Sequence, residues 1–173
     1  MIHSTDGGAH ITTNGGKTWS TQSNQPTAEF YRVEVDNNFP YRVYGCQQDN
    51  SSISVSSAGR GRQVSDWLMW GGESGHVAVD PRDGTIYSGN YTGELYRYDV
   101  RRDHVRTVTH YPQLHDGLPL YQVKYRYQWN APITLSTHQP DVLYHCSQFV
   151  HKTKDGGQTW ETNWVMDFKR LSA

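Results

Sequence analysis

The sequence predicts an all-β protein, a β-propeller of four-stranded antiparallel blades, and three observations lead to this fold class. Strand-favouring residues are abundant, with 12 tyrosines and 6 tryptophans, whereas alanine and glutamate are scarce. The octet TTNGGKTW at residues 12–19 returns as TKDGGQTW at residues 153–160. A short segment with a central tyrosine occurs three times, as RVYGC, TIYSG and VLYHC. Together these observations indicate a chain assembled from repeated β-units.

The repeat length follows from the two octets. Trp19 and Trp160 lie 141 residues apart, which is three times 47, and repeats of about 40–50 residues are typical of four-stranded propeller blades. The intervening copies are expected near residues 66 and 113, close to SDWLMW and to HVRTVTHY at 104–111. The sequence therefore predicts about three and a half blades.

Each blade is expected to be a meander of four strands. Blade one, residues 25–72, contains FYRVEVD, YRVYGCQQ, SISVSS and DWLMW. Blade two, residues 73–112, contains GHVAVD, GTIYSGN, ELYRYDV and HVRTVTH. Blade three, residues 113–164, contains APITLS, DVLYHCS, FVHKT and QTWETN. Turn residues such as DPRDG and THQPD separate first and second strands. Residues 1–24 form a half blade, whose hairpin AHITTNGGKTWST matches the last two strands of a blade, and residues 165–173 form a tail.

The octets are expected to be tight hairpin turns. An Asn or Asp followed by glycine suits the positive φ angles of such a turn, and the Asn or Asp side chain can accept hydrogen bonds from backbone N–H groups. The threonine hydroxyl can bond locally, and the tryptophan is expected to pack into the sheet. The residues with this structural role are Thr12, Asn14, Gly16, Trp19, Thr153, Asp155, Gly157 and Trp160.

The octets resemble the Asp box, Ser/Thr-x-Asp-x-Gly-x-Thr-Trp, of the BNR-repeat propellers, which include sialidases, GH74-type xyloglucanases and sortilin/VPS10 ectodomains. FPYRVYGCQQDNS, GGESGHVAVDP and YRYQWNAPITLSTHQPDVLYH most resemble large bacterial BNR-repeat or VPS10-like glycosyl hydrolases, so the resemblance covers most of the chain. STDGGAHI at 4–11 resembles a degenerate further copy, with Ile11 in place of the tryptophan. The resemblance implies that the Asp boxes are structural and that any chemistry belongs to other loops.

Loops leading into each blade, and loops between second and third strands, are expected to share one face, here called the top face. They are SNQPTAE, GGESGH, YRYQWN, QQDNSS, GNYTGE and CSQ. Their amides and aromatic rings suit a sugar, because hydroxyls bind planar polar groups and pyranose faces stack on rings. The alternative is that these residues only form polar turns. The candidate ligand-binding residues are Gln48, Asn50, His76, Tyr91, Arg126, Gln128, Trp129 and Asn130, in loops that also hold Gln25, Glu29, Gln47, Asn90 and Gln148.

Whether the protein is an enzyme stays open at this point; if it is one, glycoside hydrolysis is the expected reaction. That reaction needs two carboxyl groups roughly 5–9.5 Å apart. Asp49 and Glu73 are the candidate catalytic pair, with His76 placed to tune one of them. A sialidase would add an arginine cluster and a Tyr/Glu nucleophile pair, and Arg32, Arg126 and Tyr127 do not form such a motif.

Composition argues against several other classes. The net charge of -1 gives no general attraction for nucleic acid or anionic membranes, and neither partner is expected. No cofactor or metal is expected: His145 and Cys146 are neighbours on a strand and face opposite ways, which argues against a metal site with His151. Cys46 and Cys146 occupy equivalent repeat positions, too far apart for a disulfide. No signal peptide is recognisable, although the proteins that the chain resembles are mostly exported, so localisation stays open.

The half blade raises the question of a partner. An open arc of blades would leave strand edges unpaired. Two copies related by a two-fold axis would sum to seven blades, with the tail WVMDFKRLSA of one chain completing the half blade of the other. A homodimer is therefore expected, with a glycan as the other possible partner. The alternatives are a fragment of a longer propeller and a non-catalytic protein-interaction module, as in the sortilin relatives.

Overall fold

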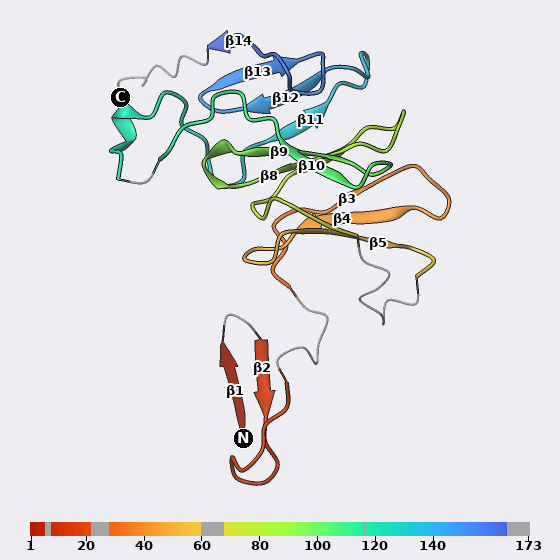
Figure 1. Ribbon diagram of the computed structural model, residues 1–173, viewed down its shortest axis with the longest axis vertical. Coiled ribbons are helices and arrows are strands. Elements are labelled where there is room, and N and C mark those ends of the chain that lie inside the picture. Colours follow the sequence, from red (N-terminus) through yellow and green to blue (C-terminus); the bar gives the residue numbers. More distant parts are fainter. Residues whose placement is uncertain (6–7, 22–27, 60–67, 116, 166–173) are drawn as a thin grey trace, which may run out of the picture.

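The computed structural model describes the chain except for residues 6–7, 22–27, 60–67, 116 and 166–173. The described part is all-β, as the composition predicted: its strands are antiparallel and its helical segments are short 3-10 turns, η2 at Tyr91–Gly93 and η3 at Leu120–Gln122. Figure 1 shows three sheets following one another in sequence order, with a separate hairpin at the N-terminal end.

Each of the three larger sheets has four strands in sequence order, as in a blade. The first contains β3 (Glu34–Val35), β4 (Arg42–Cys46), β5 (Ser52–Ser56) and β6 (Leu68–Trp70). The second contains β7 (Val77–Val79), β8 (Ile86–Gly89), β9 (Leu95–Asp99) and β10 (His104–Thr107). The third contains β11 (Ile133–Leu135), β12 (Leu143–Cys146), β13 (Phe149–Thr153) and β14 (Glu161–Val165). This topology fits a partial propeller.

The inner three strands of the second sheet, β7, β8 and β9, bury side chains on both faces. Successive side chains of a strand point to opposite sides, and this sheet lies between the other two. Val77, Ile86 and Tyr98 pack towards the first sheet, where they meet Tyr44, Cys46 and Trp70. Ala78, Tyr87 and Leu95 lie on the opposite face of the same strands and pack towards the third sheet with Val108, Ile133 and Leu143. Two small cores, one on each side of this sheet, therefore hold the three sheets together.

The first strand of the first sheet is shorter than the sequence predicted. Residues 30–36 were expected to form one strand, but β3 spans only Glu34–Val35, preceded by an isolated bridge between Phe30 and Gln47. The ring of Phe30 lies over Gly45 of β4, so close that a Cβ on Gly45 would stand 2.5 Å from Phe30 Cδ1. The missing side chain at Gly45 lets Phe30 cross the sheet instead of extending the ladder.

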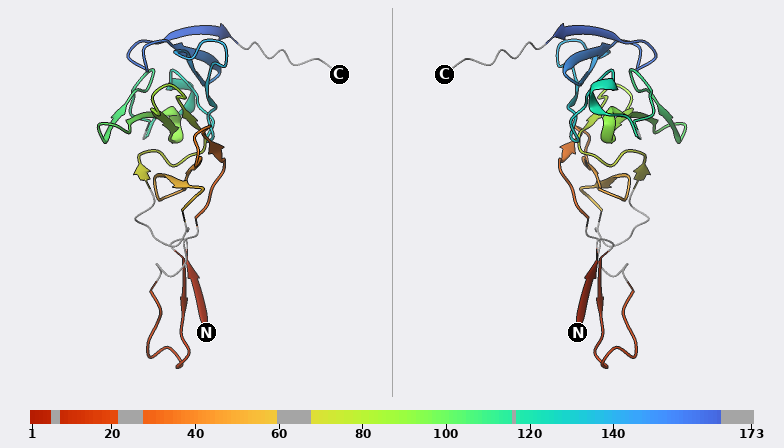
Figure 2. Two further views of the ribbon diagram at one scale, coloured as in Figure 1. Left: turned by 90° about the vertical axis from the view of Figure 1, so that its right-hand side faces the viewer. Right: turned by 90° about the vertical axis from the view of Figure 1, so that its left-hand side faces the viewer.

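The N-terminal hairpin also differs from the expected half blade. Its strands are β1 (Ile2–Thr5) and β2 (Gly8–Ile11), which pair ahead of the first octet rather than on either side of it. After the octet, the backbone N–H of Ser20 donates to the carbonyl of Ile11 at 3.0 Å. The side views of Figure 2 show this hairpin apart from the three sheets.

Cys46 and Cys146 are both free thiols. Each is the last residue of the second strand of its sheet, β4 or β12, as the repeat predicted. Within the described residues, no helix has the length and apolar character needed to span a membrane.

Candidate functional site

The top-face loops of the first two sheets are tied together by hydrogen bonds. Glu73, in the loop leading into β7, accepts a hydrogen bond from the backbone N–H of Asp49 at 2.7 Å through its Oε2 atom. Asp49 lies in the β4–β5 turn with a positive φ of 63°, and the turn is closed by a bond from Gln47 N to Ser51 O at 2.8 Å. The two predicted catalytic residues are therefore neighbours, and one of the two Glu73 carboxylate oxygens is engaged by the backbone.

A second contact joins the segment before β3 to the same turn. The hydroxyl of Tyr31 donates to the side-chain oxygen of Gln48, and Gln48 N donates to the carbonyl of Glu29 at 3.1 Å. Partial desolvation and the carboxylates of Glu29 and Asp49 raise the pKa of Tyr31, whereas the side chain of Trp129 lowers it. Tyr31 therefore lies where loops of the first and third sheets meet. Tyr31 was not among the residues predicted from the sequence, although it lies two residues after Glu29, the end of a predicted top-face loop.

Two exposed aromatic rings stack on the same face. Tyr91 and Trp129 are nearly parallel, with ring centroids 5.2 Å apart and an interplanar angle of 15°. The residues remain 43% and 40% exposed, so each ring also presents surface to solvent. Tyr91 is held by η2, where Asn90 Oδ1 accepts from Tyr91 N at 3.0 Å. The β8–β9 loop, which carries Tyr91, and the loop leading into β11, which carries Trp129, thus form one aromatic surface.

The loop leading into β11 is fixed by its own polar side chains. Gln148 Oε1 accepts from the backbone N–H of Arg126 at 2.7 Å, and Gln128 Oε1 accepts from Asn130 N. The Oδ1 atom of Asn130 is buried and packs against Gly75, where an added Cβ would collide with it. Gln128 and Asn130, both predicted to bind ligand, therefore have structural contacts in this loop.

The two remaining predicted residues lie at the edges of this site. Asn50 Nδ2 donates to the carbonyl of Gln48 at 3.3 Å, within the turn that carries Asp49. His76 is half-buried, and burial together with the nearby Arg32 lowers its pKa, against a smaller opposing effect of Glu34. Arg32, just before β3, and Glu34, in β3, are therefore near enough to His76 to affect its pKa.

The two octets form closely matching turns. In the first, Gly16 N donates to Thr12 Oγ1 at 3.0 Å and Thr18 N donates to Asn14 Oδ1 at 3.0 Å. In the second, Gly157 N donates to Thr153 Oγ1 at 3.0 Å, and Thr159 N donates to Asp155 Oδ1 at 2.9 Å. Both glycines of each octet have positive φ.

The two tryptophans of the octets differ. Trp160 packs against the second core, and its Nε1–H donates to the carbonyl of Val108 at 3.1 Å, which ties the third sheet to the second. Trp19 is 43% exposed and meets the ring of His3 edge-on at 6.4 Å. The prediction that Trp19 packs into a sheet is therefore wrong in this structure, because its hairpin lies apart from the three sheets.

A buried histidine cluster was not predicted from the sequence. His145 and His151 are register partners on β12 and β13 and share one face, with His110 centred 4.4 Å from the ring of His151. Alternation separates His145 from Cys146 on one strand, but it does not separate residues paired across strands. Among the described residues, no group of three or more His, Cys, Asp or Glu side chains is arranged to hold a metal ion. The histidine rings pack against one another and against the rings of Tyr125, Tyr127 and Trp160.

Comparison with known proteins gives a fold but no family. No protein-family model matches the chain, and no curated protein matches it. Among solved structures, it is similar to the GH74 xyloglucanase of Xanthomonas campestris, a propeller protein, with a TM-score of 0.52 and 18% sequence identity. The match covers 91% of this chain and 27% of that enzyme, so the chain spans about a quarter of its length. The likeness supports an all-β, propeller-like arrangement over most of the chain.

Proposed function

We propose that the protein is a carbohydrate-binding propeller module whose top face receives a saccharide on the Tyr91–Trp129 pair. The observation that carries this proposal is the parallel stack of two partly exposed rings contributed by separate loops. Pyranose rings present apolar C–H faces, which pack on aromatic rings, and their hydroxyls require polar groups at the edge. Tyr91 and Trp129 cover each other on one side and stay partly exposed elsewhere, so a sugar ring can pack on the surface that remains.

Polar groups beside the rings support the same proposal. Tyr31 links the two parts of the face, since its pKa responds both to Trp129 and to the carboxylates of Glu29 and Asp49. Gln48 offers a planar amide in the adjoining turn. The similar solved structure is that of a xyloglucanase, an enzyme that acts on a carbohydrate. That likeness supports the proposal only as an example of a similar fold in a protein that acts on a carbohydrate. It gives no residue of this chain a role in binding.

Glycoside hydrolysis by Asp49 and Glu73 is the second candidate function. The observation that favours it is the 2.7 Å bond from Asp49 N to Glu73 Oε2, which brings two carboxyl residues to one point of the face. A retaining or inverting pair needs its carboxyl groups roughly 5–9.5 Å apart, with the scissile bond between them. Hydrolysis of a bound glycan that is lost in both Asp49→Asn and Glu73→Gln would support it.

The binding proposal is tested on a glycan array with the wild type and three variants. Trp129→Ala and Tyr91→Ala are each expected to weaken binding of any captured glycan by about 5- to 30-fold, since an aromatic–sugar contact is worth roughly 1–2 kcal/mol. Phe39→Ala is the matched control, because Phe39 is fully exposed and lies in the β3–β4 turn, away from this face. Unchanged binding in both top-face variants would contradict the proposal, as would an array without a captured glycan.

We further propose that a second copy of the chain covers the exposed flanks and closes the arc towards seven blades. The supporting observation is that both residues of β3 are exposed, as is the neighbouring Val33 at 64%. Light scattering after size exclusion should then give about twice 19.8 kDa. A monomer that captures another protein on its top face would instead support the interaction-module alternative.

A further inference from the structure

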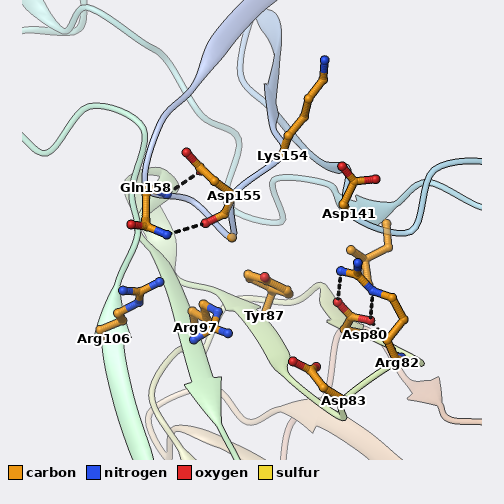
Figure 3. Close-up of a pocket in the computed structure, with 12 residues that line it drawn as sticks. Asp80, Arg82, Asp83, Tyr87, Arg97, Arg106, Asp141, Lys154, Asp155 and Gln158 are labelled. Atoms are coloured by element: carbon orange, nitrogen blue, oxygen red, sulfur yellow. Dashed lines mark hydrogen bonds and ion pairs between the residues drawn. The ribbon is translucent and has the colours of Figure 1, made fainter.

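We propose a second binding site on the face opposite the top face, a pocket that takes the carboxylate of a sugar acid between Arg97 and Arg106. The pocket has a volume of about 210 Å³ and lies between the second and third sheets, beside the turn of the second octet. Figure 3 shows the two arginines at one side of it, beneath Gln158. Its size suits one small ligand rather than an extended chain.

The arginine pair is the main observation. Arg97 on β9 and Arg106 on β10 are direct register partners, so two positive charges stand opposite each other on one face of the sheet. Like charges in this arrangement repel each other. The Nε atoms of both side chains are buried without a hydrogen-bond partner, and neither guanidinium forms an ion pair within the residues that the structure describes. Two guanidinium groups set side by side form a strong recognition element for a carboxylate.

The carboxylates of the pocket form no ion pair with these two arginines among the described residues, although the positive charge of Arg97 contributes to lowering the pKa of Asp80. Asp80 is bound by Arg82 through two contacts, at 2.6 and 3.0 Å. Asp155 accepts from the backbone and hydroxyl of Thr159 and from the hydroxyl of Thr153, which lowers its pKa to about 2. Both carboxylates therefore have partners in their own turns.

The other side of the pocket supplies acceptors for hydroxyl groups. Figure 3 places Asp83 and Asp141 near Arg82, away from the arginine pair. Gln158 lies above the two arginines in Figure 3 and donates its Nε2 to the carbonyl of Asp155 at 3.0 Å, which leaves its Oε1 as an acceptor. A ligand with a carboxylate at one end and hydroxyls at the other matches this arrangement, and a sugar acid has this chemistry.

Tyr87 forms part of the floor. It is 4% exposed, and burial raises its pKa while the nearby Arg97 lowers it. A Cβ built on Gly156 would stand 3.3 Å from both the Tyr87 hydroxyl oxygen and Arg97 Nε, so this hydroxyl lies in the pocket lining beside the arginine that would bind the carboxylate.

The test is calorimetric titration of the full chain with D-glucuronate, and with D-glucose as the neutral analogue of matched shape. Saturable 1:1 binding of glucuronate without saturable glucose binding is expected. Arg106→Gln and Arg97→Lys should weaken it at least about tenfold, the second because lysine keeps the charge but loses the forked donor geometry. Arg102→Gln is the matched control, since Arg102 is an exposed arginine of the β9–β10 turn outside the pocket.

Three outcomes would overturn the proposal. Equal binding of glucose and glucuronate would show that the carboxylate is not recognised, and sulfate binding without glucuronate binding would show a plain oxyanion site. Loss of glucuronate binding in Trp129→Ala would place the ligand on the top face instead. Circular dichroism of each variant separates lost binding from lost folding, and Arg97→Lys is the variant expected to keep the native fold.

Discussion

The carboxylate of Glu73 accepts a hydrogen bond from the backbone N–H of Asp49 at 2.7 Å. This contact joins the loop leading into the second sheet to the β4–β5 turn of the first sheet. It therefore gives Glu73 a structural role that can be measured independently of any catalytic one.

Glu73→Ala is expected to lower the free energy of unfolding by about 1 kcal/mol, because an exposed charge-assisted hydrogen bond is lost. Glu73→Gln should retain most of the stability, since its amide oxygen still accepts from Asp49 N. Urea denaturation measures both. Equal losses in the two variants would mean that the charge, not the bond, is what matters at this position.

Asp155 offers a second test, because the chain carries Asn14 at the matching position of the other octet. Asp155→Ala should cost about 1–2 kcal/mol through the loss of its turn bonds, whereas Asp155→Asn should cost less. The folded-state pKa of Asp155 is lowered to about 2 from 3.8. The contribution of the ionised Asp155 side chain to the free energy of unfolding is therefore complete above about pH 4 and is lost as pH falls towards 2. In unfolding experiments at pH 2–5, Asp155→Asn should lack that acid-dependent loss of stability. If its stability fell with pH as in the wild type, the acid-dependent loss would not come from Asp155.

Gly93→Ala is expected to be among the costlier single substitutions in the second sheet. A Cβ at Gly93 would collide with the ring of Tyr127, and its φ is +79°. Gly84 has a φ of +77°, but a Cβ added there would meet no atom within 4 Å, so Gly84→Ala isolates the backbone strain. We expect about 1 kcal/mol for Gly84→Ala and about 2–4 kcal/mol for Gly93→Ala. Similar values by urea denaturation would show that Tyr127 moves aside at little cost.

The histidine cluster predicts acid sensitivity. Burial, with a smaller effect of His151, His110 and His76, lowers the pKa of His145 to about 3, and burial with the neighbouring His110 lowers that of His151 to about 4. Both histidines are therefore neutral in the folded state. Their contribution to the free energy of unfolding falls as pH drops from about 6.5 towards 4, because over this range the unfolded chain binds protons that the folded chain does not. Both ring nitrogens of His145 are buried without a hydrogen-bond partner, and its ring stacks on Tyr127 at 4.7 Å.

His145→Phe removes these unpaired nitrogens and keeps a ring. At pH 7 the free energy of unfolding of this variant should equal or exceed that of the wild type. Between pH 4 and 6.5 its unfolding midpoint should depend less on pH than the wild-type midpoint does. The midpoint is followed by tryptophan fluorescence. A variant with the wild-type slope would assign the acid sensitivity to other groups.

Much of the top face could be placed from sequence, because loop position in a meander determines which edge of the sheet a residue occupies. Asp49, Glu73, Tyr91 and Trp129 were selected on that basis, and the structure brings them together in two pairs, Asp49 with Glu73 and Tyr91 with Trp129. Tyr31 was missed because its role depends on a neighbour in another sheet. Ligand binding by the aromatic pair stays a prediction, which the glycan-array variants test.

The sequence by itself determined the all-β class, the octet turns and the order of strands within each sheet, because these depend on residues close together in the chain: alternation, turn glycines and local side-chain hydrogen bonds. Only the tertiary structure decided which tryptophan is covered, that Arg97 and Arg106 share a pocket with the second octet, and that His145 and His151 meet His110. These depend on contacts between sheets. A sequence repeat predicts equivalent positions, but the packing of a neighbouring sheet determines what each position contacts.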